Sequence, residues 1–96
     1  MKTDKNIIEI VGYTTDNKPV CKGVYKAFET HGIPLDILFD LLNKNDMVIS
    51  WVDFYKEARN AGMGHNRIIS KLEESICDVF GVGYFEVVRF NLRGFE

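Results

Sequence analysis

Carboxylates at helical spacing are the first side chains in this sequence that could do chemistry. Three pairs stand four residues apart, namely Asp36 with Asp40, Asp53 with Glu57, and Glu74 with Asp78. General acid–base catalysis needs such groups in a pocket that shifts their pKa values. Each pair falls on the polar side of an amphipathic segment, where carboxylates are normally solvated. We therefore predict no catalytic residue and no enzymatic activity.

Side chains that could bind zinc or act as nucleophiles are scattered along the chain: Cys21, His31, His65 and Cys77. Zinc sites use clustered Cys and His at short spacing, which this arrangement lacks. Two cysteines so far apart also fit reduced thiols better than a disulfide framework. The segment 62–64 lacks the further glycines and the lysine of a phosphate-binding loop. The sequence therefore predicts no metal site and no cofactor.

Ala58, Gly62 and Ile68 place a small residue, a glycine and an aliphatic residue at set intervals in the segment 51–80. Helix-turn-helix DNA-binding motifs need a small residue where two helices cross, a glycine at the bend and an aliphatic anchor on the second helix. The segment therefore resembles such a motif. The resemblance implies that the start of the second helix carries side chains able to reach bases or phosphates. These are His65, Asn66, Arg67, Ser70 and Lys71.

Two features of the same segment argue against DNA binding. Lys71 stands where such motifs usually have a second aliphatic anchor, and Leu72 comes one position late. The rest of the second helix is acidic, with Glu73, Glu74 and Asp78. Because neutralisation of phosphates supplies most of the affinity for DNA, a helix pair with a slight acidic excess binds DNA poorly. A helix-turn-helix transcriptional regulator is therefore the alternative function.

Composition and charge are those of an ordinary globular domain. Of the 96 residues, 46% are apolar and 27% are charged, with a net charge of −2. This balance excludes a strongly basic nucleic-acid coat and a strongly acidic DNA mimic. We predict a single domain over residues 1–96, with a flexible N-terminus at residues 1–6. The apolar run at 7–11 is too short for a signal sequence or a membrane span, which favours a cytoplasmic location and no membrane partner.

Hydrophobic periodicity predicts four helices, at residues 20–31, 34–42, 51–61 and 65–80. Pro34 suits a first helical turn, where its missing N–H costs nothing. Ser50 followed by Asp53 is typical of a helix N-cap. The helix at 34–42 has apolar residues on two faces, including Ile37 and Leu41 on the second. We expect it to be the most buried element.

Runs of β-branched and aromatic residues at 7–13 and 84–92 predict two strands. The predicted fold is α+β and predominantly helical, with a four-helix core flanked by an N-terminal and a C-terminal β-strand. The two strands pair most simply with each other. Because an isolated two-stranded ribbon is only marginally stable, a homodimer joined through its edge is a further hypothesis.

A small domain without chemistry of its own is typical of proteins that act by contact with another macromolecule. The leading prediction is a non-enzymatic protein-interaction or inhibitor-type regulator, of the kind that phages and mobile elements use in host takeover or anti-defence. Trp, Met and Phe are enriched at binding hot spots. The predicted interface therefore comprises Met47, Val48, Trp51, Phe90, Leu92 and Phe95. No residue identifies the partner.

Overall fold

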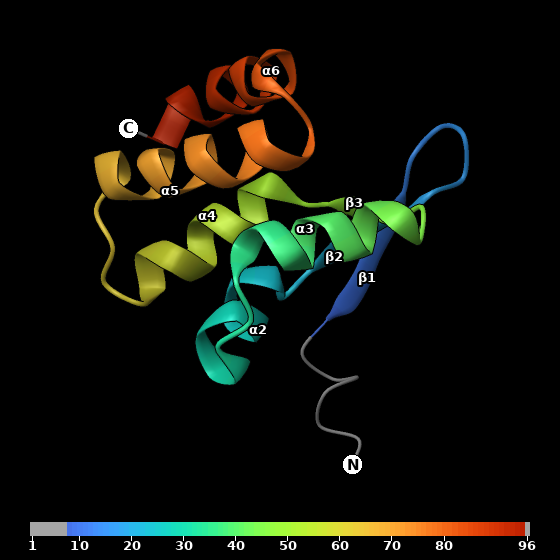
Figure 1. The fold of residues 1–96 in the computed structure, drawn as a ribbon, viewed down its shortest axis with the longest axis horizontal. Helices are drawn as coiled ribbons and strands as arrows, with labels where there is room; N and C mark the ends of the chain where they lie inside the picture. The colour runs from blue at the N-terminus through green and yellow to red at the C-terminus, as the bar shows by residue number, and fades with distance from the viewer. Residues whose placement is uncertain (1–7, 96) are drawn as a thin grey trace.

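The computed structural model describes residues 8–95, which form a predominantly helical fold with a small sheet (Figure 1). The predicted flexible segment 1–6 lies outside the described residues. In chain order the elements are β1 (Glu9–Tyr13), β2 (Pro19–Lys22), α2 (Val24–His31), α3 (Leu35–Lys44), β3 (Val48–Ile49), α4 (Trp51–Asn60), α5 (His65–Val79), α6 (Val82–Leu92) and the 3-10 turn η1 (Arg93–Phe95). The described part of the chain thus has five α-helices where the sequence predicted four.

The sheet has the strand order β1-β2-β3, with β1 at an edge. β1 and β2 form an antiparallel hairpin, and in its turn the Thr14 N–H donates to the Lys18 carbonyl. β2 pairs in parallel with β3, with Cys21 opposite Ile49. The predicted helix at 20–31 is therefore too long at its start. Its first residues belong to β2, and the helix begins only after Gly23, whose φ of 90° lies outside the helical range.

The predicted C-terminal strand is wrong, because residues 82–92 form α6. A run of aromatic and β-branched residues fits a strand or a buried helix equally well by composition. The deciding pattern is the spacing of Phe85, Val88 and Leu92, which α6 buries on one face against α5. The N-terminal strand pairs with β2, so the two terminal segments do not form a ribbon together.

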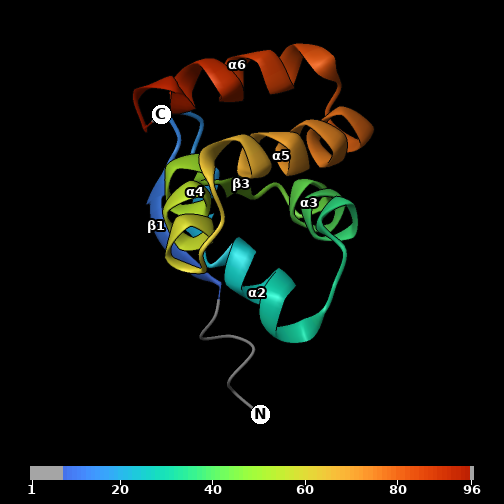
Figure 2. The same cartoon turned by 90° about the vertical axis from the view of Figure 1, so that its left-hand side faces the viewer.

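The helices stack in layers, and the sheet lies to one side of them (Figure 1). Figure 2 shows α5 lying across α3 and α4, and α6 covering α5 as the outermost layer. The core between these layers contains the largest side chains that are fully shielded from solvent, among them Phe39, Phe54, Ile68, Leu72, Ile76 and Leu92. One continuous core therefore joins all the helices.

The helix at 34–42 carries apolar residues on two faces, but the structure buries only one of them. α3 buries Leu35, Leu38, Phe39 and Leu42, whereas Ile37 and Leu41 are each 55% exposed. The reason is that α3 lies at the side of the molecule, so α2, α5 and β3 cover only its inner face. Its second apolar face is left at the surface.

The start of α4 confirms the predicted cap. The Asp53 N–H donates to Ser50 Oγ at 3.4 Å, and the Ser50 hydroxyl donates to Asp53 Oδ2 at 2.6 Å. The cap satisfies an N–H that the first helical turn would leave without a partner. It also fixes Trp51 as the first residue of the helix.

Candidate functional site

The α4–α5 corner has the local geometry that the helix-turn-helix resemblance requires. Ala58 and Ile68 are completely buried, and Gly62 adopts a φ of 99°, which favours glycine. The surroundings of α5 are less suited to DNA. α5 packs against α3 on one side and α6 on the other, so only one of its faces is exposed, and the second half of that face is acidic.

Two of the five predicted DNA-contacting side chains have other partners. Tyr55 Oη lies 2.7 Å from His65 Nδ1, and Lys71 Nζ lies 5.2 Å from the centre of the Phe28 ring. The remaining three, Asn66, Arg67 and Ser70, are exposed. α5 therefore exposes few basic side chains, and its second half exposes carboxylates.

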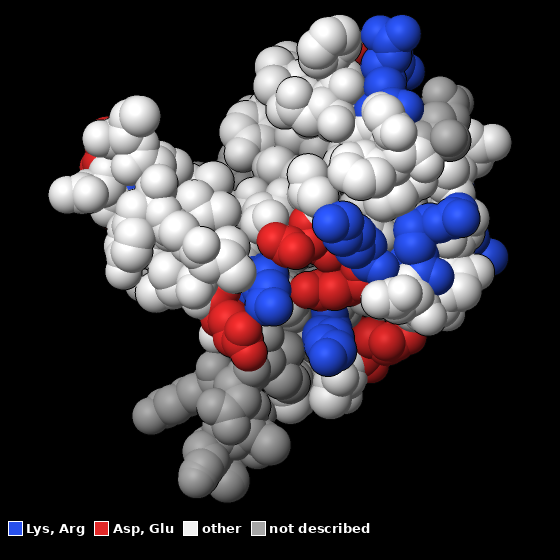
Figure 3. All heavy atoms as spheres, turned by 180° about the vertical axis from the view of Figure 1, so that it is seen from behind, with Lys and Arg blue, Asp and Glu red and all other residues white. Residues whose placement is uncertain are grey.

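Charged side chains gather instead around a hollow between the hairpin, α2 and α4. Its volume is about 620 Å³, and Figure 3 shows acidic and basic groups alternating on this side of the molecule. The charged residues that line it are Glu9, Lys22, Lys26, Glu29, Asp53, Lys56 and Glu57. Because opposite charges lie side by side, the hollow has no strong potential of one sign for a charged ligand.

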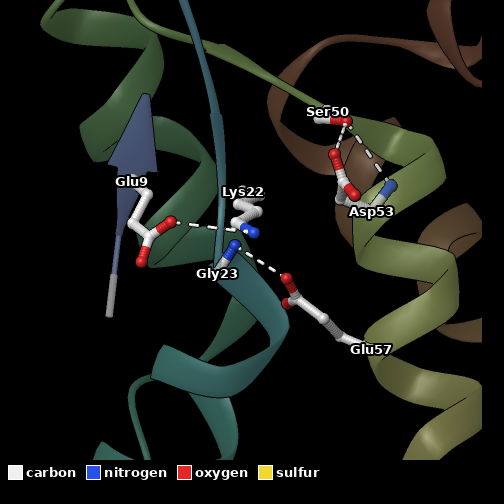
Figure 4. Close-up of polar contacts among 6 residues, drawn as sticks. All are labelled: Glu9, Lys22, Gly23, Ser50, Asp53 and Glu57. Carbon is white, nitrogen blue, oxygen red and sulfur yellow. Dashed lines mark hydrogen bonds and ion pairs between the residues drawn. The ribbon is translucent and has the colours of Figure 1, made fainter. Parts of the chain in front are cut away.

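The carboxylates of this hollow have structural partners (Figure 4). Glu57 Oε2 accepts the N–H of Gly23 at 2.9 Å, which caps the start of α2, and Glu57 Oε1 is buried without a hydrogen-bond partner in the part of the chain described. Glu9 lies 3.7 Å from Lys22 Nζ. Asp53 thus forms hydrogen bonds at the start of α4, and Glu57 forms one at the start of α2. We assign this pair no catalytic role.

Trp51 is the centre of an aromatic cluster at the junction of α3, α4, α5 and α6. Its ring meets Phe39 edge-on at 5.2 Å and Phe80 edge-on at 6.4 Å. Its indole N–H donates to Tyr84 Oη at 3.3 Å, and Tyr84 stacks on Phe80 with 4.5 Å between ring centres. These contacts fix the indole in one orientation while leaving part of it exposed.

We define the Trp51 surface as Trp51, Val52, Phe80 and Tyr84. Val52 is 37% and Tyr84 38% exposed, and the other two are half-buried. The predicted residues Met47 and Val48 precede this surface on the chain and are also half-buried. The sequence indicated Trp51 but missed Phe80 and Tyr84. Both residues are aromatic in the sequence, but the strand predicted at 84–92 does not place Tyr84 beside Trp51.

The other half of the predicted interface divides between core and surface. Leu92 is completely buried, so its assignment to an interface is wrong, whereas Phe90 is 67% exposed. In a strand, residues two apart share a face, but in a helix they point about 200° apart. Phe95 is partly exposed, and its ring lies 5.3 Å from that of Tyr55.

No protein family, curated protein or solved structure matches this chain. Within residues 8–95, no three His, Cys, Asp or Glu side chains lie close enough together to hold a metal ion. None of the helices described has the length and apolar character needed to cross a membrane. The choice of site therefore depends on the geometry of the residues themselves, and the Trp51 surface is the candidate.

Proposed function

We propose that this protein is a non-enzymatic, inhibitor-type regulator that binds another protein through the Trp51 surface. The observation that carries the proposal is the partly exposed indole of Trp51, held between Phe39 and Phe80 and hydrogen-bonded to Tyr84. Trp and Tyr are the residue types that contribute most at protein interfaces. A role in host takeover or anti-defence is the biological setting we propose with it.

The rigidity of the cluster supports this role. A side chain that is free in the unbound protein loses conformational entropy when a partner orders it, at a cost of about 0.5–1.5 kcal/mol. The edge-on and stacked ring contacts hold the aromatic groups of the Trp51 surface before any partner arrives. Val52, which follows Trp51 in the chain, is apolar and 37% exposed. A partner with an apolar patch or a short amphipathic helix fits such a surface.

The alternative function, DNA binding by the α4–α5 corner, has the buried Ala58 and Ile68 and the glycine bend in its favour. It remains the second candidate because only Arg67, among the basic residues of the predicted set, is exposed. A DNA-binding helix of this kind requires several exposed cations close to phosphates.

Affinity purification with the whole protein as bait tests the proposal, using lysate of the cells that naturally produce it. Val52→Glu places a charge on the Trp51 surface at an exposed helical position, so it should fold normally. Val87→Glu is the matched control, because it makes the same change on the outer face of α6. We expect wild type and the control to recover the same partner protein in equal amounts. Val52→Glu should reduce the amount recovered by about tenfold or more.

Equal recovery by Val52→Glu and wild type would contradict the proposal. Titration of random-sequence duplex DNA, followed by fluorescence anisotropy, tests the alternative. Binding that weakens steeply with salt and is lost in Arg67→Ala would favour the DNA-binding function over protein binding.

A further inference from the structure

Two hollows lie side by side between α3 and α5. Their volumes are about 320 Å³ and about 300 Å³, and both are lined by Asp36 and Asp78, so they form one groove. α5 contributes residues three and four positions apart, which share one face of the helix. We call this site the α3–α5 groove, and its polar lining comprises Asp36 and Asp40 from α3 and Lys71, Glu74, Ser75 and Asp78 from α5.

The groove carries more carboxylates than ammonium groups. Asp40 Oδ2 lies 3.0 Å from Lys44 Nζ, at the end of α3. Neither Glu74 nor Asp78 forms an ion pair with the residues that the structure describes. A hollow lined mainly by charges of one sign raises the local concentration of ligands of the opposite sign. The ligand that fits this lining is therefore positively charged.

Ser75 is a second and independent indication that a polar ligand binds in this groove. It is only 8% exposed, and it lines the first hollow. The other side chains that α5 buries, Ile68, Leu72 and Ile76, are all apolar. The Ser75 hydroxyl forms no hydrogen bond with the residues that the structure describes. Since a buried hydroxyl without a partner is unfavourable, Ser75 Oγ is available to a ligand in the hollow.

Apolar side chains complete the lining beside the carboxylates. Phe28 and Leu35 line the first hollow, and Ile37 and Val79 line the second. The carboxylates of each helix stand four positions apart, which is about 6 Å along the helix axis. The negative charges are thus spread along the groove, with apolar surface next to them. A linear aliphatic polyamine has the matching pattern, because its ammonium groups are separated by short methylene chains.

An ammonium group already contacts the wall of the first hollow. Lys71 Nζ lies 5.2 Å from the centre of the Phe28 ring, which is the distance of a cation–π contact. This ammonium belongs to the chain itself. The contact indicates that the aromatic wall favours a group of the kind that a polyamine would bring.

We propose that the α3–α5 groove binds a linear aliphatic polyamine. Its ammonium groups bind the carboxylates of α3 and α5, Ser75 Oγ accepts an ammonium N–H, and the methylene chains pack on the apolar lining. Because the carboxylates are at the surface, salt weakens the binding. The proposal is independent of the protein partner of the Trp51 surface, because the groove shares no residue with that surface.

Isothermal titration calorimetry of the full chain with spermidine at low salt tests the site. We expect saturable binding, which Glu74→Gln should weaken by about tenfold. Glu73→Gln is the matched control, because it removes the same charge from an exposed neighbouring position of α5 outside the groove, and it should bind as wild type does. No saturable binding, or an equal loss in both variants, would overturn the proposal.

Two further variants separate a built site from a general attraction of charges. Ser75→Ala keeps every charge and should weaken spermidine binding by about threefold or more, because it removes the hydroxyl. Lys71→Met removes the ammonium that competes for the Phe28 ring and should strengthen binding by about threefold, whereas Lys56→Met on α4, outside the groove, should not. Unchanged affinity in both Ser75→Ala and Lys71→Met would contradict the site. Binding of a lysine-rich peptide without binding of spermidine would replace the polyamine by a protein ligand and overturn the proposal.

Discussion

At the scale of single residues, the sequence predicted whether a side chain is buried or exposed better than it predicted the element on which the side chain lies. Trp51 was expected at a contact surface and lies at a partly exposed aromatic junction. Cys21 was read as a helical residue, but it lies completely buried on β2, where its thiol donates to the Val48 carbonyl at 3.4 Å. β2 pairs with β3, with Cys21 opposite Ile49, and no local pattern reveals a pairing between such distant segments.

Cys21 should react with thiol reagents much more slowly than Cys77. Burial raises the pKa of the Cys21 thiol above its ordinary value of 9.0, and the thiolate is the reactive form. Cys77 is only half-buried. Mass spectrometry after timed labelling of the native protein measures both rates, and labelling in urea is the control. Equal native rates would show that Cys21 is accessible.

The same shift gives the stability of the protein a pH dependence. Since the folded pKa of Cys21 is raised, its contribution to stability is complete below pH 9.0 and is lost as the pH rises through the folded pKa. Burial also raises the pKa of Tyr25, which acts in the same direction. The free energy of unfolding in urea should therefore fall at alkaline pH.

Leu92 and Phe95 provide a contrast between core and surface at the end of the chain. Leu92→Ala should lower the free energy of unfolding by about 2–5 kcal/mol, because it leaves a cavity beneath α6. Phe95→Ala should cost less, since Phe95 is partly exposed and loses mainly its contact with Tyr55. Urea unfolding measures both. Similar losses would contradict the assignment of residues 82–92 to a helix with Leu92 on its inner face.

At the scale of elements, prediction succeeded where a helix carries its own boundary signals. The Ser50 cap and the glycine bend of the α4–α5 corner are local features, and both helices begin where expected. Residues 82–92 carry no such signal. α6 is apolar on both its inner and outer faces, so neither helical nor strand periodicity stands out in its sequence. Only its packing on α5 decides between the two.

The bend between α4 and α5 offers a matched pair of glycines. Gly62 has a φ of 99° and Gly64 a φ of −79°, and an added Cβ would meet nothing within 4 Å at either position. Gly62→Ala should therefore destabilise the protein by about 1 kcal/mol or more through backbone strain alone. Gly64→Ala should be nearly neutral. Thermal unfolding compares the two, and equal midpoints would contradict the strained bend.

At the scale of the whole molecule, the sequence predicted a predominantly helical α+β fold, and its predominantly helical character is confirmed. The sequence did not predict the order of the helical layers, because contacts between distant segments determine that order. That order determines the surfaces: it turns α6 outward, and it brings Phe80 and Tyr84 beside Trp51. The Trp51 surface is thus a consequence of the arrangement of helices, and it is only partly visible in the sequence.

Site-specific photo-crosslinking in the cells that produce the protein tests the central claim most directly. A photo-crosslinking amino acid at Val52 should give one discrete adduct with a different protein, identified by mass spectrometry. The same probe at Val87, which is exposed on α6, is the comparison and should give no such adduct. No discrete adduct at Val52, or the same adduct from Val87, would contradict the claim that the Trp51 surface binds a partner protein.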